Sequence, residues 1–277
     1  NALGGLHTLE DFAATACDYV DPISTDYHGH KLVELPPNGQ GATALLIMNI
    51  LRRFDIASLD PNGTQRTHLE AEATKLAYEA RNRFIADPQT SELRLAHMLS
   101  EQTADELAAL INPERAMHDV TARTEAVHKD TVYLTVVDEQ RNAVSMIYSI
   151  FHPFGSGLAS NRFGLLFQRP LHTLIPGLLT RPGDYMMPFG VMGGAYQAAG
   201  HARFVSNLID FKMGLQQAMD MPRGFADLLT GELSLEAGYS DTVAAELTAM
   251  GHKVVRPEIG IGGSQAIRID LQTNLLA

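Results

Sequence analysis

Two alternating segments, residues 131–138 and 143–151, constrain the fold of this chain more than any other feature. In the first, Thr131 and Tyr133 alternate with apolar side chains, which is the two-residue period of a half-buried strand. The polar run 139–142 between the segments predicts a turn, so we expect a hairpin whose first strand opens at Thr131. Threonine is common in strands because its branched side chain suits a pleated surface, and position alone gives Thr131 no special role.

The chain has 277 residues, enough for one large domain or two modest ones with a sizeable core. Its hydrophobic content of 45% and charged content of 19% are those of an ordinary soluble globular protein. A formal net charge of −11 with scattered basic residues argues against a nucleic acid or an anionic membrane as partner, because both require clustered Lys and Arg. No apolar run approaches the roughly 20 residues of a membrane-spanning helix.

The sequence predicts neither a metal site nor a cofactor. Cys17 is the single cysteine, which excludes an internal disulfide, and we expect it to be a buried structural thiol because no reactive context surrounds it. His28 and His30 lack a carboxylate or Cys partner at ligand spacing, so we interpret them as solvent-facing histidines of a turn. Neither a P-loop nor a dinucleotide-binding fingerprint fits the glycine-containing segments.

The first residues, Asn1-Ala2-Leu3-Gly4-Gly5, have neither the basic nor the apolar region of a signal peptide. Because residue 1 is not Met, we expect an upstream segment to be missing, which leaves export open. We therefore favour a cytoplasmic location, with a periplasmic or secreted one as the alternative.

Periodicity and turn residues predict the remaining elements. The string Pro-Pro-Asn-Gly-Gln-Gly at 36–41 is expected to be a turn that packs the backbone tightly against neighbouring structure. Residues 112–130 are polar and without periodicity, as an exposed segment open to cleavage would be. Strands are predicted within 23–35 (two, joined at a His-Gly turn), 164–168, 233–236, 253–255 and 262–269, and helices within 8–18, 42–51, 68–87, 100–111, 201–211, 215–221 and 242–250.

Several short motifs occur in a fixed order along the chain. They are the string at 36–41, Thr131 followed by a strand that ends Val-Val-Asp, Phe-Gly-Ser-Gly at 154–157, the pair Gly193-Gly194 before a helix, and Gly-Ser-Gln-Ala-Ile at 263–267. In this order they resemble the gamma-glutamyltransferase (gamma-glutamyl transpeptidase) family. The resemblance covers nearly all of the chain and about the second half of a complete family member. It implies an α+β fold, the four-layer αββα sandwich of N-terminal-nucleophile hydrolases, with two stacked, mostly antiparallel sheets between helices.

The resemblance also implies a self-processing enzyme without a cofactor or a metal. The chain would be cut between Asp130 and Thr131, and Thr131 would become a nucleophile with its own freed α-amine as base. The backbone N–H groups of Gly193 and Gly194 would form an oxyanion hole. The products would be part of a large subunit, 1–130, and a small catalytic subunit, 131–277, which together form one folded domain and assemble as a dimer of heterodimers.

The implied substrates are small γ-glutamyl amides such as glutathione, with water or an amino acid or peptide amine as the acyl acceptor. The substrate-binding positions of the family correspond here to Ser149, His172 and Thr173. The family has a Ser-Ser pair where this chain has His172 and Thr173. Phe151 replaces a polar Asn of the transpeptidases, and Lys129 precedes the cleavage site. These departures leave open two alternatives, a glutaryl-type (cephalosporin) acylase of the same family and an inactive, uncleaved homologue with a binding role.

Overall fold

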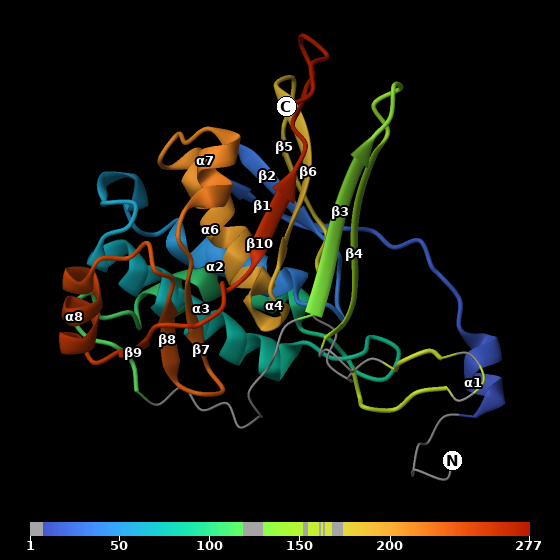
Figure 1. The fold of residues 1–277 in the computed structure, drawn as a ribbon, viewed down its shortest axis with the longest axis horizontal. Coiled ribbons are helices and arrows are strands. Elements are labelled where there is room, and N and C mark those ends of the chain that lie inside the picture. Colours follow the sequence, from blue (N-terminus) through green and yellow to red (C-terminus); the bar gives the residue numbers. More distant parts are fainter. Residues whose placement is uncertain (1–7, 119–129, 152–154, 161, 163, 168–173) are drawn as a thin grey trace.

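A six-stranded antiparallel sheet runs through the middle of the molecule, in the order β1-β2-β5-β6-β10, with β11 also paired to β6 (Figure 1). The computed structural model describes residues 8–118, 130–151, 155–160, 162, 164–167 and 174–277. The strands of this sheet are β1 (Ile23–Tyr27), β2 (His30–Glu34), β5 (Gly177–Arg181), β6 (Tyr185–Met192), β10 (Gly263–Ala266) and β11 (Ile269–Asp270). The strands of the early and the later part of the chain meet in this sheet, since β2 pairs with β5.

The predicted hairpin is present as a second, two-stranded sheet made of β3 (Asp130–Val137) and β4 (Ala143–Phe151). The side chains alternate as expected. Tyr133 and Ile147 are buried on one face of the hairpin, whereas the apolar side chains next to them on each strand point outward. Within the described part of the chain this outer face stays exposed, and its members are Val132, Leu134, Val136, Val144, Met146 and Tyr148.

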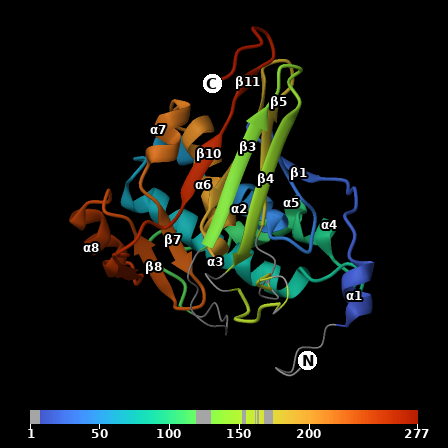
Figure 2. The ribbon, with the colours of Figure 1, turned by 45° about the vertical axis from the view of Figure 1, so that its right-hand side comes forward.

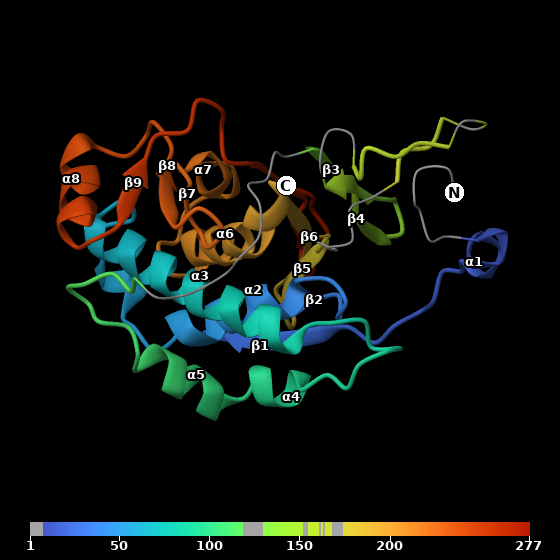
Figure 3. The ribbon, with the colours of Figure 1, turned by 90° about the horizontal axis from the view of Figure 1, so that it is seen from below.

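The hairpin and the helices lie on opposite faces of the six-stranded sheet. Successive residues of a strand point to opposite sides, and on β6 the ring of Phe189 packs against His201 and Phe204 of a helix. The next residue, Gly190, faces the ring of Tyr133 on β3. Figures 2 and 3 show the resulting order of layers: helices, six-stranded sheet, hairpin.

The helix α2 (Gly41–Leu51) is central to the core, and every residue in it is buried. A helix that is apolar all round requires neighbours on all sides, and α2 packs against β1, β2, α3 and α6. The helices are α1 (Leu9–Ala14), α3 (Thr64–Phe84), α4 (Leu95–Met98), α5 (Glu101–Ala108), α6 (Gln197–Ile209), α7 (Leu215–Asp220) and α8 (Asp241–Ala249), with short 3₁₀ turns η1 (Ile56–Ser58) and η2 (Gly194–Tyr196). No described helix combines the length and the apolar character needed to cross a bilayer.

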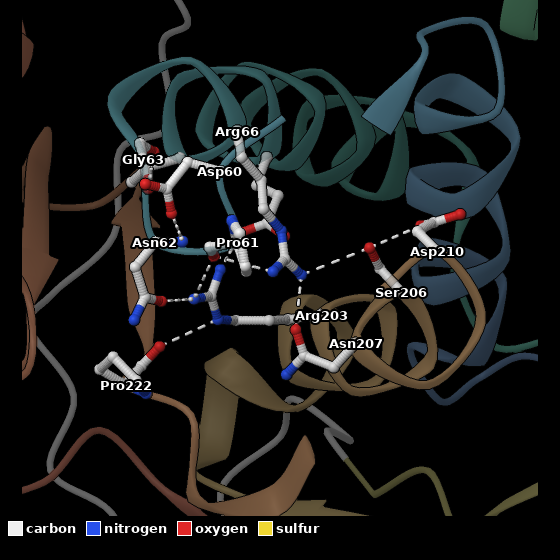
Figure 4. A network of polar contacts seen from close by, with 12 residues as sticks. Asp60, Pro61, Asn62, Gly63, Arg66, Arg203, Ser206, Asn207, Asp210 and Pro222 are labelled. Atoms are coloured by element: carbon white, nitrogen blue, oxygen red, sulfur yellow. Dashed lines mark hydrogen bonds and ion pairs between the residues drawn. The ribbon is translucent and has the colours of Figure 1, made fainter. Parts of the chain in front are cut away.

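A buried polar network ties α3 to α6 (Figure 4). Arg66 on α3 is fully buried and donates to Glu70, to the carbonyl oxygen of Pro61 and to Asn207 on α6. Arg203 on α6 donates to the other carboxylate oxygen of Glu70, at 2.6 Å. Because each guanidinium is satisfied by several acceptors, the charges are buried without being left unpaired.

A smaller three-stranded sheet, β7 (Gly224–Asp227), β8 (Glu232–Leu235) and β9 (Lys253–Val255), packs with α8 at one end of the molecule. β8, α8 and β9 follow the predicted alternation of strand, helix and strand, whereas β7 was not predicted.

Three expectations about individual segments are wrong or incomplete. Cys17 is exposed rather than buried, because residues 15–22 form no regular element and pack against no core. Residues 164–168 do not form a strand among the described residues; Leu166 makes only an isolated bridge to Ala159. Of the two turn histidines, His28 is half-exposed as expected, but His30 is partly buried and its Nδ1 lies 2.6 Å from the hydroxyl of Tyr185.

Candidate active site

Strand β3 begins with an irregularity at Thr131. Asp130 pairs with Phe151, whereas Thr131 pairs with Ser149, so the intervening Ile150 of β4 has no partner and the register shifts between Asp130 and Thr131. Such a bulge bends the strand and re-aims its side chains, and bulges are common beside active sites. The hydroxyl oxygens of Thr131 and Ser149 lie 3.0 Å apart, within hydrogen-bond distance.

The pair Gly193-Gly194 lies at the same end of the sheets as Thr131. In Figures 1 and 2, β3 starts at the end where β6 leads into α6. Tyr133 on β3 faces Gly190 on β6. Thr131 precedes Tyr133 by two residues and Gly193 follows Gly190 by three, and both steps lead toward that end. The stacking of β3 on β6 therefore brings the start of the hairpin towards the glycine turn.

The glycine turn has a backbone conformation that few other residues adopt. Gly193 has φ 144° and Gly194 has φ 59°, and a Cβ on Gly193 would lie 2.9 Å from the carbonyl oxygen of Ile261. The carbonyl of Gly193 accepts from the N–H of Tyr196. Among the hydrogen bonds of the described residues, none is donated by the N–H group of Gly193 or of Gly194, and both glycines are buried.

A buried glutamine holds this turn in place. Gln40, from the string at 36–41, donates from Nε2 to the carbonyl oxygen of Gly194 at 3.2 Å, and its Oε1 accepts from Arg81 at 3.0 Å. The following Gly41 is required by space, since a Cβ there would lie 2.5 Å from the carbonyl oxygen of Leu35. The expectation that this string packs the backbone tightly is confirmed, and the string also supports the glycine turn.

Polar groups are buried on both faces of the six-stranded sheet as well. The phenol of Tyr133 contacts the hydroxyl of Ser145 at 2.8 Å, and burial raises the pKa of Tyr133, so the phenol stays neutral. Glu34 and His201 form a fully buried pair, with Oε1 and Nδ1 2.6 Å apart. Burial raises the pKa of Glu34, because the low-dielectric interior disfavours its ionised form more than His201 favours it.

The structure brings together some of the residues predicted from the sequence. Thr131 and Ser149 are in contact, and the stacking of Gly190 on Tyr133 brings Gly193 and Gly194 towards the same end. Asp130 is the first residue of β3, but nothing is described of its side chain or of that of Phe151. His172, Thr173 and Lys129 lie outside the described residues.

Two positioning contacts were not expected from the sequence, those of Gln40 with Gly194 and of Gly190 with Tyr133. The contact of Gly190 with Tyr133 had one signal in the sequence, a glycine inside an otherwise continuous strand. Such a glycine often marks the close approach of another element.

Helices on one face of an antiparallel sheet, a second sheet on the other, and likeness to a solved acylase define the class of protein: an α+β fold of the N-terminal-nucleophile hydrolase type. A family model described as gamma-glutamyltranspeptidase matches residues 1–169 and 167–277. The chain belongs to the gamma-glutamyltranspeptidase family.

Similar proteins include ones named as glutathione hydrolases and ones named as acylases. The chain is 29% identical to the glutathione hydrolase-like YwrD proenzyme of Bacillus subtilis (strain 168), covering 96% of this chain and 55% of that protein. It is 31% identical to the acylase ACY 1 proenzyme of Pseudomonas sp. (strain SE83), covering 96% of this chain and 51% of the relative. The solved cephalosporin acylase from Bacillus halodurans is similar with a TM-score of 0.84 and 31% identity, over 99% of this chain and 54% of that one. The chain thus spans about half the length of the relatives it matches.

Proposed function

We propose that this chain is the catalytic part of a self-processing amide hydrolase in which Thr131 is the nucleophile. The observation that carries the proposal is the position of the Thr131 hydroxyl. It lies 3.0 Å from the hydroxyl of Ser149, at a bulged strand start, and at the end of the sheets where the N–H groups of Gly193 and Gly194 donate none of the hydrogen bonds of the described residues.

The first step is cleavage of the chain before Thr131. Its Oγ attacks the carbonyl carbon of Asp130, the C–N bond breaks as the nitrogen takes a proton, and an ester links the two residues. This breakage frees the α-amine of Thr131, and water then hydrolyses the ester, which releases a carboxylate at Asp130 and restores the hydroxyl of Thr131. The bulge supports this step because it interrupts regular pairing at the bond to be cut.

The freed α-amine is the base for the second reaction. Its unperturbed pKa of about 7.7–8.0 lies close to neutral pH, so it can take the proton of the Thr131 hydroxyl. The hydroxyl oxygen attacks a substrate amide, the N–H groups of Gly193 and Gly194 hold the negative oxygen, and an acyl-enzyme forms as the amine leaves. Each such donor is typically worth about 3 kcal/mol in the transition state. Water or an amino acid or peptide amine then takes the acyl group.

The two products of cleavage are expected to stay together as one domain, 1–130 and 131–277. The six-stranded sheet supports this, because β1 and β2 precede the cut whereas β5, β6, β10 and β11 follow it. The polar network between α3 and α6 also joins the two parts. We expect a dimer of such heterodimers.

For the substrate we propose a small amide with a γ-glutamyl or a glutaryl acyl group. A γ-glutamyl group is supported by Ser149 beside the nucleophile and by the hydroxyl of Thr173, with His172 as a donor to the carboxylate of the substrate. A glutaryl group is supported by similarity to proteins named acylases and by Phe151 in place of a polar residue. The opposing hypothesis is an uncleaved homologue with a binding role.

The test is incubation of the purified chain, followed by a denaturing gel and by assays of amine release from a γ-glutamyl anilide and a glutaryl anilide. We expect two fragments cut before Thr131 and release from at least one anilide. Thr131→Ala should give one intact band and no release. Thr135→Ala, the same change on the same strand face, is the matched control and should be cleaved. A wild type that stays intact and inactive would favour the binding role, and turnover by Thr131→Ala would remove Thr131 from the reaction.

A further inference from the structure

A cluster of metal-ligating side chains lies in the buried region between α3 and the segment after α8. His68 and Glu72 are one helical turn apart on α3 and therefore share a face, and His252 approaches them from a position 184 residues along the chain from His68. All three are buried, and one ligand atom from each lies within 4.8 Å of the others. Charged and imidazole groups are seldom gathered in a core without a partner or a metal.

The hydrogen bonds of the cluster determine which nitrogen is available. His68 Nε2 lies 2.8 Å from the carbonyl oxygen of Asn112, which can only accept, so the proton of neutral His68 is on Nε2. Its Nδ1 therefore carries a lone pair and lies 2.8 Å from His252 Nε2. A histidine that donates one ring N–H to a backbone carbonyl while its other nitrogen faces a shared point is arranged as metal-bound histidines are.

A cavity of about 120 Å³ reaches His252 and provides room for water beside the cluster. Its lining includes Lys75, Asp227 and Glu232. The ammonium of Lys75 contacts Glu72 Oε1 at 2.6 Å and thus occupies the place of a cation. Because Glu232 is paired with Lys253 at 2.9 Å, Asp227 is the lining carboxylate left for Lys75 when a metal displaces it from Glu72.

We propose that His68 Nδ1, His252 Nε2 and a carboxylate oxygen of Glu72 bind a divalent transition metal ion, with Zn²⁺ the best fit to this donor set. Two imidazoles and one carboxylate are a common zinc ligand set, and water from the cavity would be the fourth ligand. At Zn–N distances of about 2.0–2.1 Å the two nitrogens are roughly 3.3 Å apart, so the rings separate by about half an ångström. The proton on His252 Nε2 moves to Nδ1, and no net proton is released.

A bound ion would join three parts of the chain that hydrogen bonds now connect. Asn112 accepts from His68, and the N–H of Met117 donates to Glu72 Oε2 at 2.9 Å. The ion would thus fix α3, residues 112–117 and the segment at His252 to one point. This role is structural and does not depend on the proposed chemistry of Thr131.

The first test uses the wild-type chain, freed of metal by chelation and titrated with CoCl₂ or ZnCl₂ alone. We expect one ion per chain, visible absorption bands of four-coordinate Co²⁺ that disappear when Zn²⁺ is added, and a higher Tm with zinc. Absence of a bound ion and of these bands would overturn the proposal without any variant.

The second test compares affinities. His252→Asn and Glu72→Gln should each weaken zinc binding by about 100-fold or more, since loss of even an outer partner costs about 10–100-fold. Lys75→Met should strengthen binding by about 10-fold, because the competing cation is gone. His28→Asn is the control, an exposed histidine that lies beside the carboxylate of Asp210, and should not change the affinity.

A hydrogen-bond network with no affinity for metal predicts the reverse for Lys75→Met, namely lower stability and no gain in zinc binding. Equal zinc affinity in the wild type and in both ligand variants would also contradict the proposal. Lys75→Met keeps all three proposed ligands, so its zinc affinity distinguishes a metal site from a hydrogen-bond network even if a ligand variant does not fold.

Discussion

The hydroxyl of Ser149 is the side-chain contact of Thr131 that bears most directly on the proposed chemistry, at 3.0 Å. We expect Ser149→Ala to slow both self-cleavage and anilide turnover by about 10–100-fold, because the Thr131 hydroxyl loses a partner that orients it. Ser149→Thr keeps a hydroxyl and should retain most of the rate. Single-turnover cleavage followed on denaturing gels measures the first effect, and equal rates for the two variants would show that the contact is incidental.

The two glycines of the turn should respond differently to alanine. Gly194 has φ 59°, which an L residue adopts at a cost of about 1 kcal/mol. Gly193 has φ 144°, and its Cβ would also approach the carbonyl of Ile261, so we expect Gly193→Ala to lower the free energy of unfolding by about 2–3 kcal/mol. Urea denaturation of both variants checks the order. A larger loss for Gly194→Ala would mean that backbone conformation does not govern this turn.

Single residues also show where prediction from the sequence succeeds. Alternation and the short polar turn predicted the hairpin that carries Thr131, but not the pairing of Thr131 with Ser149 beside a register shift. Burial of Cys17 was predicted because no reactive context surrounds it, and it is wrong because no neighbouring element covers its segment.

At the scale of elements, Gly190 determines how closely the hairpin lies on the six-stranded sheet. A Cβ at Gly190 would come within 2.3 Å of the ring of Tyr133, which is 2% exposed. We expect Gly190→Ala to push β3 from β6, to lower the free energy of unfolding by about 1–3 kcal/mol and to slow self-cleavage, since Thr131 is carried by the same strand. Gly214→Ala is the control, because nothing lies within 4 Å of its added Cβ. Urea midpoints together with cleavage rates measure both effects, and an unchanged cleavage rate in a destabilised Gly190→Ala would separate hairpin packing from processing.

Most elements could be predicted from the sequence because their cause is local. The apolar run of α2 and the caps of α5 and α8, Ser100 and Ser240, act within a few residues. Contacts between elements have no such local cause. Gln40 reaches Gly194 across 154 positions and His68 reaches His252 across 184, so neither pattern nor spacing indicates them.

At the scale of the whole molecule, Glu70 links the part before the proposed cut to the part after it. Its carboxylate accepts from Arg66 on its own helix and from Arg203 on α6, and its side chain is 14% exposed. Loss of this charge leaves two guanidinium groups short of a partner. We therefore expect Glu70→Gln to lower the free energy of unfolding by about 3 kcal/mol at neutral pH.

The same carboxylate should make the stability of the fold depend on acid. Burial by itself raises the pKa of Glu70, but the charges of Arg203 and Arg66 outweigh it, and the net pKa lies below the usual 4.5. Below pH 4.5 the unfolded chain therefore binds a proton that the folded chain does not, so this stabilisation is complete above that pH and is lost as the pH falls through the lowered pKa. Urea midpoints at pH 7 and pH 4 should differ less for Glu70→Gln than for the wild type. Glu79→Gln, which removes an exposed pair with Arg83 one turn along on the same helix, should retain the full acid dependence of the wild type. If Glu70→Gln and Glu79→Gln showed the same pH dependence, the acid response would have to come from other carboxylates than the one that joins α3 to α6.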